Sequence, residues 1–356
     1  MAGAGVDTVG VVGAGLMGTG IAVQLALAGC RVRVLDSEPG RLEQLPGTVT
    51  RILTALRDAG LVERGASGAA QALISADSDD AALGDVGWVS EAVPEVLELK
   101  HGVYGRLEAV LPVDAVIASN TSGFLPSRLG EPLRHPERFL VAHFWNPPHA
   151  VPLVEVVPGR ATGQDAIDRT MDLLGRTRAD VVLLQHEIPG FIGNRLQFAL
   201  LREALNIVRS GAATPADVDR VMTASLGRRY AVLGPFETAD LGGLDTFLDI
   251  ASHLMPDLAK DEEVLEVLRA RVQAGDVGWR SGRGFHDWPP ERLATVIAQR
   301  DADLLRRVRE DRVREDRVRE DRVREDRVRE DRVREDRVGE DRDVGRGAGT
   351  TSGDDA

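Results

Sequence analysis

The stretch Val9–Gly20, VGVVGAGLMGTG, decides the fold of the first half of the chain. It joins a short β-branched run to an apolar helix through a turn of the pattern Gly-x-Gly-x-x-Gly. Gly13 permits the tight turn, Gly15 lets the backbone approach a diphosphate, and Gly18 lets the helix pack closely on the strand. A diphosphate there lies at the helix N-terminus, where unpaired N–H groups and the helix dipole favour negative charge. We therefore expect a dinucleotide to bind along Gly13, Gly15, Leu16, Met17 and Gly18.

The residue that closes the next predicted strand, Arg31–Leu35, is Asp36. A carboxylate at this place hydrogen-bonds the ribose hydroxyls of a dinucleotide, and its charge repels a 2′-phosphate. The sequence therefore predicts NAD rather than NADP as the cofactor, although Arg41 lies close enough in the chain to soften that preference. The alternative role for Asp36 is that of a strand-end carboxylate that caps the following helix.

Length and composition bound the rest of the molecule. The chain has 356 residues, which favours two domains, and its 43% hydrophobic content is sufficient for real cores. The net charge of −13 disfavours a nucleic-acid partner, because no basic excess can displace counterions from phosphates. Cys30 is the only cysteine, so no internal disulfide can form, and packing is its expected role. With neither a basic leader nor an apolar run of ~20 residues, we expect a cytoplasmic protein without membrane contact.

Strands and helices alternate up to about Gln185–Pro189, which predicts a largely parallel sheet. The helical stretches that follow are Phe191–Ser210, Pro215–Leu226, Gly243–Leu254 and Glu262–Ala274. We therefore expect an α/β fold with a Rossmann-type sheet domain followed by a smaller all-α domain. The predicted divisions are 1–187 for cofactor binding, 188–300 for substrate binding and dimerisation, and 301–356 for a charged tail.

The tail is built from a five-residue repeat, Val-Arg-Glu-Asp-Arg, that runs from Val308 to about Arg342. Each repeat puts a glutamate four residues before an arginine, as in Glu310 and Arg314, which supports an exposed helix. A five-residue step advances about 140° around a helix, so the valines spread over all faces and form no coiled-coil seam. We expect a solvated charged helix or a disordered segment that is dispensable for the rest of the molecule.

A histidine and a glutamate occupy two successive predicted strands. His143 follows the strand Phe139–Val141, and Glu155 lies in the next apolar run, Val154–Val157. Alcohol oxidation by NAD needs a base for the hydroxyl proton, and histidine, with a pKa near ~6.5, suits that role at neutral pH. A carboxylate on the other ring nitrogen fixes the tautomer and stabilises the imidazolium. The pair is a candidate catalytic dyad, and a purely structural pair is the alternative.

Further motifs occur in one order over about residues 7–300. Besides the glycine turn they are Asn120–Ser122, His143–Pro147, Val154–Val156, Pro189–Leu196, Gly234–Asp245 and Ser281–Phe285. With this set the chain resembles the 3-hydroxyacyl-CoA dehydrogenase family. The resemblance implies NAD-linked oxidation of a secondary alcohol and a homodimer formed through the helical domain, with Phe191–Ser210 and Gly243–Leu254 as the contact.

The resemblance also implies roles for individual residues. His143 is expected to be the general base and Glu155 its orienting partner, while Ser122 and Asn194 hydrogen-bond the substrate oxygen and the histidine region. Asn146 is expected to shape its loop and to offer a polar contact to the substrate. No metal site is expected. The residues that match the ribose and nicotinamide side of the cofactor site are Glu95, Lys100 and Asn120.

Alternatives are open at several of these points. Asn194 is also placed to cap its own helix, and Lys100 to form a surface salt bridge. A family member can also keep the fold as a structural protein, as lambda-crystallin does, although here the four expected catalytic residues occur together. NADP-linked reduction of a related acid is disfavoured by Asp36.

The motifs point to two different substrate classes. Gly234–Asp245 is typical of the enzymes that act on CoA thioesters. Thr121–Ser127, Trp145 and Gly227–Tyr230 are typical of relatives that oxidise free hydroxy acids, such as L-gulonate and carnitine dehydrogenases. In those relatives an arginine at the place of Arg229 is expected to face a substrate carboxylate, because a guanidinium suits that bidentate contact. The carboxylate can belong to a substrate bound in the neighbouring subunit. Pairing with acidic surface groups is its alternative role.

The motif Gly234–Asp245 of the second domain narrowly favours a CoA thioester as the substrate. The predicted substrate is a small molecule, a short-chain 3-hydroxyacyl-CoA such as 3-hydroxybutyryl-CoA. Arginines after Asp36 that are available for a CoA phosphate are Arg51, Arg57 and Arg64. A free 3-hydroxy acid of the L-gulonate or carnitine type is the alternative.

Overall fold

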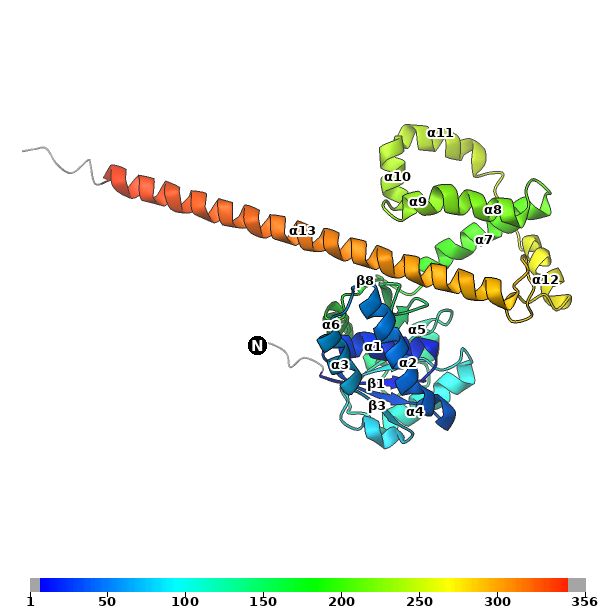
Figure 1. Cartoon of the computed structure of the whole chain (residues 1–356), viewed down its shortest axis with the longest axis horizontal. Helices are drawn as coiled ribbons and strands as arrows, with labels where there is room; N and C mark the ends of the chain where they lie inside the picture. The colour runs from blue at the N-terminus through cyan, green and yellow to red at the C-terminus, as the bar shows by residue number, and fades with distance from the viewer. Residues whose placement is uncertain (1–6, 345–356) are drawn as a thin grey trace, which may run out of the picture.

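The computed structural model describes the backbone of residues 7–344 and the side chains of residues 7–318. Its first part is built around one sheet of eight strands in the order β3-β2-β1-β4-β5-β6-β7-β8 (Figure 1). Neighbouring strands are parallel except β6 and β7, which pair antiparallel. The strands are β1 (Thr8–Val12), β2 (Arg31–Leu35), β3 (Ile74–Asp77), β4 (Trp88–Glu91), β5 (Val116–Ser119), β6 (Phe139–Phe144), β7 (Leu153–Pro158) and β8 (Asp180–Leu183).

Helices cover both faces of the sheet, so its apolar strands are buried on each side. They are α1 (Leu16–Leu27), α2 (Pro39–Asp58), α3 (Arg64–Ala72), α4 (Leu97–Val110), α5 (Pro126–Leu129) and α6 (Gln164–Gly175), with 3₁₀ turns η1 (Asp80–Leu83) and η2 (Pro136–Arg138). One face packs against α1, α2 and α6, where Ile21 and Leu25 are fully buried. The other packs against α4 and α5, where Tyr104 and Leu129 are fully buried. This layered arrangement confirms the expected Rossmann-type fold.

The glycine turn between β1 and α1 depends on the absence of side chains. Gly13 has φ of +107°, a conformation that L-residues rarely adopt. A Cβ on Gly18 would lie 1.8 Å from the carbonyl oxygen of Gly13, so any side chain there would force the helix away from the strand. At Gly15 a Cβ would meet only the Arg41 guanidinium, at 3.8 Å, so this stretch of backbone is open to a ligand.

The helical region after β8 has little core of its own. Its elements are α7 (Gly193–Arg209), α8 (Pro215–Val221), a π-helical turn η3 (Met222–Leu226), α9 (Gly227–Tyr230), α10 (Pro235–Gly242), α11 (Leu244–Leu254), η4 (Glu263–Leu265) and α12 (Glu266–Gln273). Its buried apolar cluster consists, within the described residues, of Leu205, Ala259 and Val264. Phe236 and Leu248 are instead 85% and 69% exposed. Figure 1 shows α8–α11, here called the arm, standing away from the sheet domain.

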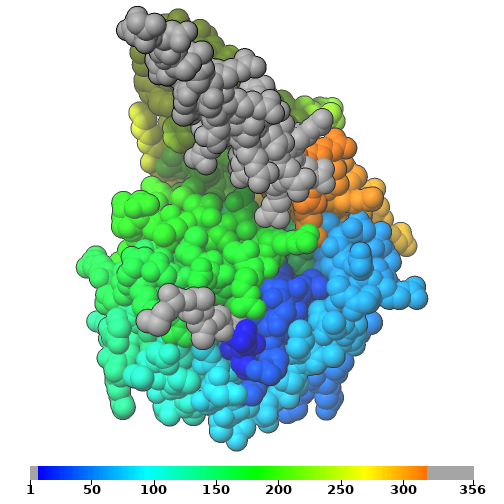
Figure 2. All heavy atoms as spheres, turned by 90° about the vertical axis from the view of Figure 1, so that its left-hand side faces the viewer, coloured from blue at the N-terminus to red at the C-terminus, as the bar shows by residue number. Residues whose placement is uncertain are grey.

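The last described element is α13 (Pro290–Val344), a single helix of 55 residues. Further along the helix, α13 packs on the sheet domain, where Leu305 is 5% exposed and joins the core beside α1 and α2. Figure 2 shows this orange stretch against the blue N-terminal helices. The repeat is therefore helical up to Val344; the expected division at residue 300 falls inside α13, and residues 345–356 lie outside the described part. None of the helices in residues 7–344 is both long and apolar enough to cross a bilayer.

Candidate active site

The two residues of the predicted dyad face each other across neighbouring strands. β6 and β7 pair with His143 opposite Glu155, so residues twelve apart in the chain become direct neighbours. His143 Nδ1 lies 3.0 Å from Glu155 Oε2, and both side chains are almost completely buried. Because the carboxylate accepts a hydrogen bond, the neutral imidazole carries its proton on Nδ1 and presents Nε2 as the free base.

The Glu155 carboxylate also holds the first turn of α7. Its Oε1 accepts hydrogen bonds from the backbone N–H groups of Ile192 at 2.9 Å and Gly193 at 3.0 Å, and Trp145 Nε1 donates to Oε2 at 3.2 Å. Burial raises the pKa of Glu155, but these hydrogen bonds, with that from His143 the strongest, outweigh burial and hold the pKa below its ordinary value. The carboxylate therefore stays ionised and joins the sheet domain to the helical region.

Ser122 and Asn194 lie at the other nitrogen of the imidazole. Ser122 Oγ is 3.1 Å from His143 Nε2, and Asn194 Nδ2 donates to the backbone carbonyl of Ser122 at 2.9 Å. Asn120 accepts the N–H of Phe144 at 2.9 Å, which ties the loop after β5 to the end of β6. A substrate hydroxyl beside Ser122 would lie within reach of Nε2, so the arrangement can accept a proton from an alcohol.

The strand-end carboxylate of Asp36 lies beside the glycine turn. Its Oδ2 accepts the N–H of Ala14 at 2.7 Å, and its Oδ1 accepts the N–H of Glu38 at 2.9 Å. Arg41 Nη1 is 3.7 Å from Oδ2. The carboxylate is thereby held at the edge of the turn, next to the open backbone at Gly15. An open glycine turn with a fixed carboxylate beside it fits a dinucleotide with a free ribose.

Lys100 is buried, so the alternative of a surface salt bridge is wrong. Its side chain is 1% exposed, and Nζ donates to Glu91 Oε1 at 2.8 Å and lies 3.3 Å from Glu95 Oε2. The hydroxyls of Tyr104 and Ser119 donate to the other oxygen of Glu91, at 2.6 and 2.7 Å. Lys100 thus pairs with two carboxylates, of which Glu95 is the one that lines the cavity beside His143.

Glu91 is a buried charge that the sequence analysis missed. The available signal was an acidic residue at the end of a buried strand, the same signal that singled out Asp36. Burial, and next the negative charge of Glu91, raise the pKa of the Tyr104 phenol far above its usual range, so Tyr104 stays a hydrogen-bond donor. Glu95 in turn accepts hydrogen bonds from the loop Thr121–Gly123, so this buried network reaches the loop that carries Ser122.

A cavity of about 550 Å³ opens beside the dyad. Predicted site residues that line it are Met17, Glu95, Asn120, Ser122, His143, Asn146 and Asn194. Gln197 also lines the cavity and was missed. Its position three residues after Asn194 puts it on the same face of α7, which is the signal that would have found it.

Other predicted residues lie outside this cavity. Leu16 projects from the glycine turn and is 57% exposed. Arg229 lies on α9 of the arm, is exposed, and is not among the residues that line the cavity. Figure 1 shows α9 well away from the sheet domain, so a single chain does not bring Arg229 to His143.

Comparison with known proteins defines the class. Residues 8–188 match the family model of the 3-hydroxyacyl-CoA dehydrogenase NAD-binding domain, and residues 190–288 match that of the C-terminal domain. The fold and these matches make the protein an NAD-dependent oxidoreductase. The chain belongs to the 3-hydroxyacyl-CoA dehydrogenase family.

Similar proteins within this group act on different substrates. The chain is 31% identical to 5-formyl-3-hydroxy-2-methylpyridine 4-carboxylate 5-dehydrogenase of Mesorhizobium japonicum, over 86% of this chain and 99% of that protein. A solved structure of an enzyme of that name superimposes with a TM-score of 0.79 over 84% of this chain and 96% of that one, at 30% identity. L-carnitine dehydrogenase of Nocardiopsis dassonvillei is 37% identical, over 84% and 90%. The structure of (S)-3-hydroxybutyryl-CoA dehydrogenase from Ralstonia eutropha superimposes with a TM-score of 0.67 over 80% and 99%, at 28% identity.

Proposed function

We propose that this protein oxidises the secondary hydroxyl of a free 3-hydroxy acid with NAD, and that His143 is the general base. The observation that carries the general-base part of the proposal is the hydrogen-bonded chain from Ser122 through His143 to the ionised Glu155. NAD supplies the hydride acceptor when it is bound. His143 Nε2 takes the hydroxyl proton, and Glu155 stabilises the imidazolium that results. Ser122 and the Asn194 amide hold the substrate oxygen.

The motif that favoured a CoA thioester has a structural explanation. Within Gly234–Asp245, the N–H of Gly234 donates to Glu237 Oε2 at 2.9 Å, which caps the start of α10. Gly243 has φ of +86° at the sharp change of direction between α10 and α11. These residues serve the fold of the arm whichever substrate binds, so the motif no longer favours CoA.

Features typical of the hydroxy-acid relatives lie at the dyad itself. Trp145 donates to Glu155, and its ring centroid is 5.6 Å from that of His143. A Cβ on Gly193 would come within 2.2 Å of the Trp145 ring, so the start of α7 is shaped around this indole. Relatives of 36–37% identity that span most of the chain carry the name L-carnitine dehydrogenase, which supports a substrate without CoA.

A short-chain 3-hydroxyacyl-CoA is the second candidate substrate. It is supported by the family models and by the likeness to the (S)-3-hydroxybutyryl-CoA dehydrogenase structure over nearly all of that chain. The chemistry at His143 is the same for both candidates, because the reacting group in each is a secondary hydroxyl.

We further propose a homodimer formed through the helical domain, residues 188–300. Large apolar side chains of α7–α11 are exposed in one chain, and a second copy is the partner that the family resemblance favours. Examples are Phe198, Leu241, Leu248 and Leu254. In this dimer the arm of one subunit brings its Arg229 to the cavity of the other, where the guanidinium pairs with the substrate carboxylate.

Turnover of L-carnitine, L-gulonate and 3-hydroxybutyryl-CoA with NAD tests the substrate class. The proposal expects one of the free acids to be oxidised with the highest kcat/KM. Arg229→Ala should raise KM for that acid at least ~10-fold, because it removes a charge-assisted bidentate contact. Arg228→Ala, the neighbouring exposed arginine, is the matched control and should leave KM unchanged. A preference for the CoA thioester, untouched by Arg229→Ala, would instead support the second candidate.

A further inference from the structure

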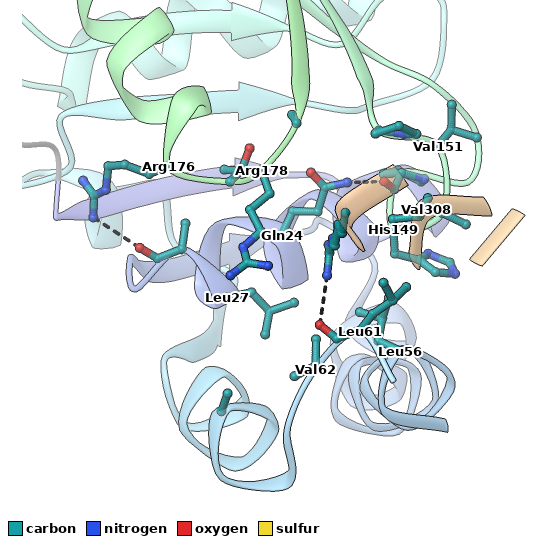
Figure 3. Close-up of a pocket in the computed structure, with 18 of the residues that line it drawn as sticks. Gln24, Leu27, Leu56, Leu61, Val62, His149, Val151, Arg176, Arg178 and Val308 are labelled. Carbon is teal, nitrogen blue, oxygen red and sulfur yellow. Dashed lines mark hydrogen bonds between the residues drawn. The ribbon is translucent and has the colours of Figure 1, made fainter. Parts of the chain in front are cut away.

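A second cavity, of about 570 Å³, lies beside the loop between β6 and β7 (Figure 3). Its walls are the end of α1, the loop between α2 and α3, residues 148–152 between β6 and β7, residues 176–179 between α6 and β8, and the repeat helix α13. None of its lining residues lines the cavity beside His143. The first unit of the charged repeat contributes Val308 and Arg312, so the tail helps to build this cavity.

Two arginines meet at this cavity without a carboxylate between them. Arg178 points from its loop into the cavity in Figure 3. Arg312 Nη1 donates to the carbonyl oxygen of Leu61 at 2.9 Å. Among the side chains of residues 7–318, neither guanidinium has a carboxylate within ion-pairing distance. Burial, and next the positive charge of Arg178, lower the pKa of Arg312, so the two charges repel each other in the structure.

Carboxylates near the pair only partly offset this repulsion. Glu63 lines the cavity, and Glu315 and Asp316 of α13 act on Arg312 electrostatically from outside the cavity. Arg176, which also lines the cavity, has its own partners, since it donates to the carbonyl oxygen of Ala28 at 3.4 Å. The local charge of the cavity is therefore positive although the whole chain is acidic.

Arg178 lies in the turn that follows α6, where its φ of +59° is a left-handed conformation of the kind that commonly follows a helix end. His149 adds a polar group, because its Nδ1 is buried and has no hydrogen-bond partner. The larger apolar side chains of the lining are Leu27, Leu56, Leu61, Val62, Val151 and Val308.

We propose that this cavity binds a small organic anion, with its phosphate or carboxylate group between Arg178 and Arg312 and its apolar part on the apolar surface of the cavity. An anion between the two guanidinium groups relieves their repulsion and receives charge-assisted hydrogen bonds from both. Such a ligand holds the first repeat of α13 against the sheet domain, since it contacts residues of both. The site is separate from the proposed catalytic chemistry and does not depend on it.

Calorimetric titration of the full chain, saturated with NADH so that the dinucleotide site is filled, tests the proposal. The probes are pyrophosphate and octanoate, which separate a phosphate ligand from an apolar carboxylate. We expect one of them to bind saturably, and Arg178→Gln and Arg312→Gln each to weaken that binding at least ~10-fold. Arg178→Lys, which keeps the charge but loses the planar fork, should weaken it less.

Arg314→Gln is the matched control, because Arg314 lies two residues after Arg312 on the same helix. It pairs with Asp311 at 3.9 Å and does not line the cavity. Its binding of the probe should equal that of the wild type, and the affinity for NADH should be the same in all variants. The proposal is overturned if neither probe binds, if Arg178→Gln or Arg312→Gln leaves binding unchanged, or if Arg314→Gln weakens it equally.

Discussion

The sheet domain and the arm of the helical region use apolar residues in opposite ways. In the sheet domain the apolar residues of each strand are buried between helices, and many side chains, such as Val9, Trp88 and Phe144, are at most 2% exposed. In the arm, Phe236, Leu241 and other large apolar side chains are mostly exposed, and none of the residues of α8–α11 is buried. One part completes its own core, whereas the other leaves its apolar surface for a partner.

The difference between the two regions explains where the candidate site is formed. His143, Glu155 and Ser122 lie on the self-contained sheet domain, whose rigidity suits a site that needs fixed distances. Arg229 lies on the arm, whose place relative to the dyad depends on the proposed partner copy. The residues proposed to accept the proton thus lie together in one chain, whereas the proposed recognition of a substrate carboxylate needs two chains.

Glu155→Gln tests the contact between the sheet domain and the helical region, and it has the largest expected effect among the changes that compare these two regions. The substitution removes the charge that stabilises the imidazolium, so kcat should fall ~10²–10³-fold. Glu203→Gln is the control, because Glu203 accepts hydrogen bonds from Ala259 and Asn206 within the helical region only. Steady-state kinetics give kcat for both variants. An equal fall in kcat in both would show that Glu155 has only a structural role.

The same residue gives a pH dependence of stability. The pKa of Glu155 in the folded protein lies below its unfolded value near 4.5, so its stabilising contribution is present above that pH and lost as the pH falls through the folded pKa. The free energy of unfolding of the wild type should therefore exceed that of Glu155→Gln at pH 7, and the gap should narrow below about pH 4.5. Denaturant unfolding at several pH values measures this difference in unfolding free energy. A difference that became larger in acid would contradict the stabilising role of the ionised Glu155.

Leu305→Ala tests whether α13 belongs to the self-contained part. Leu305 is 5% exposed in the core of the sheet domain, so its truncation should cost about 2–4 kcal/mol of unfolding free energy. Val313→Ala, on the same helix but 46% exposed, should cost less than ~0.5 kcal/mol. Chemical denaturation compares them. Equal, small effects would mean that the helix does not pack on the domain as described.

Phe236→Ser tests whether the exposed surface of the arm is an interface. Phe236 is 85% exposed on the arm, and its replacement should weaken the proposed homodimer at least ~10-fold, since large apolar anchors dominate interfaces. Val113→Ser is the control, because Val113 is 69% exposed on the sheet domain. Sedimentation equilibrium gives the dissociation constants. A wild-type chain that stays monomeric at micromolar concentration would remove the proposed dimer.

The smallest expected effect concerns Asp36. The wild type should bind NADH severalfold more tightly than NADPH, because the carboxylate favours ribose hydroxyls and repels a 2′-phosphate. Asp36→Asn, which keeps the size of the side chain but loses its charge, should reduce this ratio. Fluorescence titration with each nucleotide measures it, and equal wild-type affinities would remove the role proposed for Asp36.

Local patterns in the sequence predict the part of the fold that depends on neighbouring residues. The glycine turn, the strand before it and the helix after it follow from residues close together in the chain, and the structure has each of them. The pentad repeat likewise predicts a helix without an apolar seam, and Val313 is about half exposed. The packing of α13 on the sheet domain was not predicted, because it comes from Leu304 and Leu305, just before the repeat, and from contacts of the first repeat with distant residues, such as that of Arg312 with Leu61.

The parts that escaped prediction depend on pairing between distant segments. Residue type and spacing singled out His143 and Glu155, but only the antiparallel register of β6 and β7 makes them neighbours. Glu91 is surrounded by Lys100, Tyr104 and Ser119, which come from two other elements, so its burial cannot be read from the residues around it in the chain.

The substitution His143→Gln tests the central claim most directly, by comparing kcat with the affinity for NADH in one preparation. A base that acts mainly in the transition state should, when removed, lower kcat by at least ~10²-fold and leave NADH affinity within about twofold of the wild type. Turnover at the wild-type rate in a correctly folded variant would show that another group accepts the proton. The pair formed by His143 and Glu155 would then be structural.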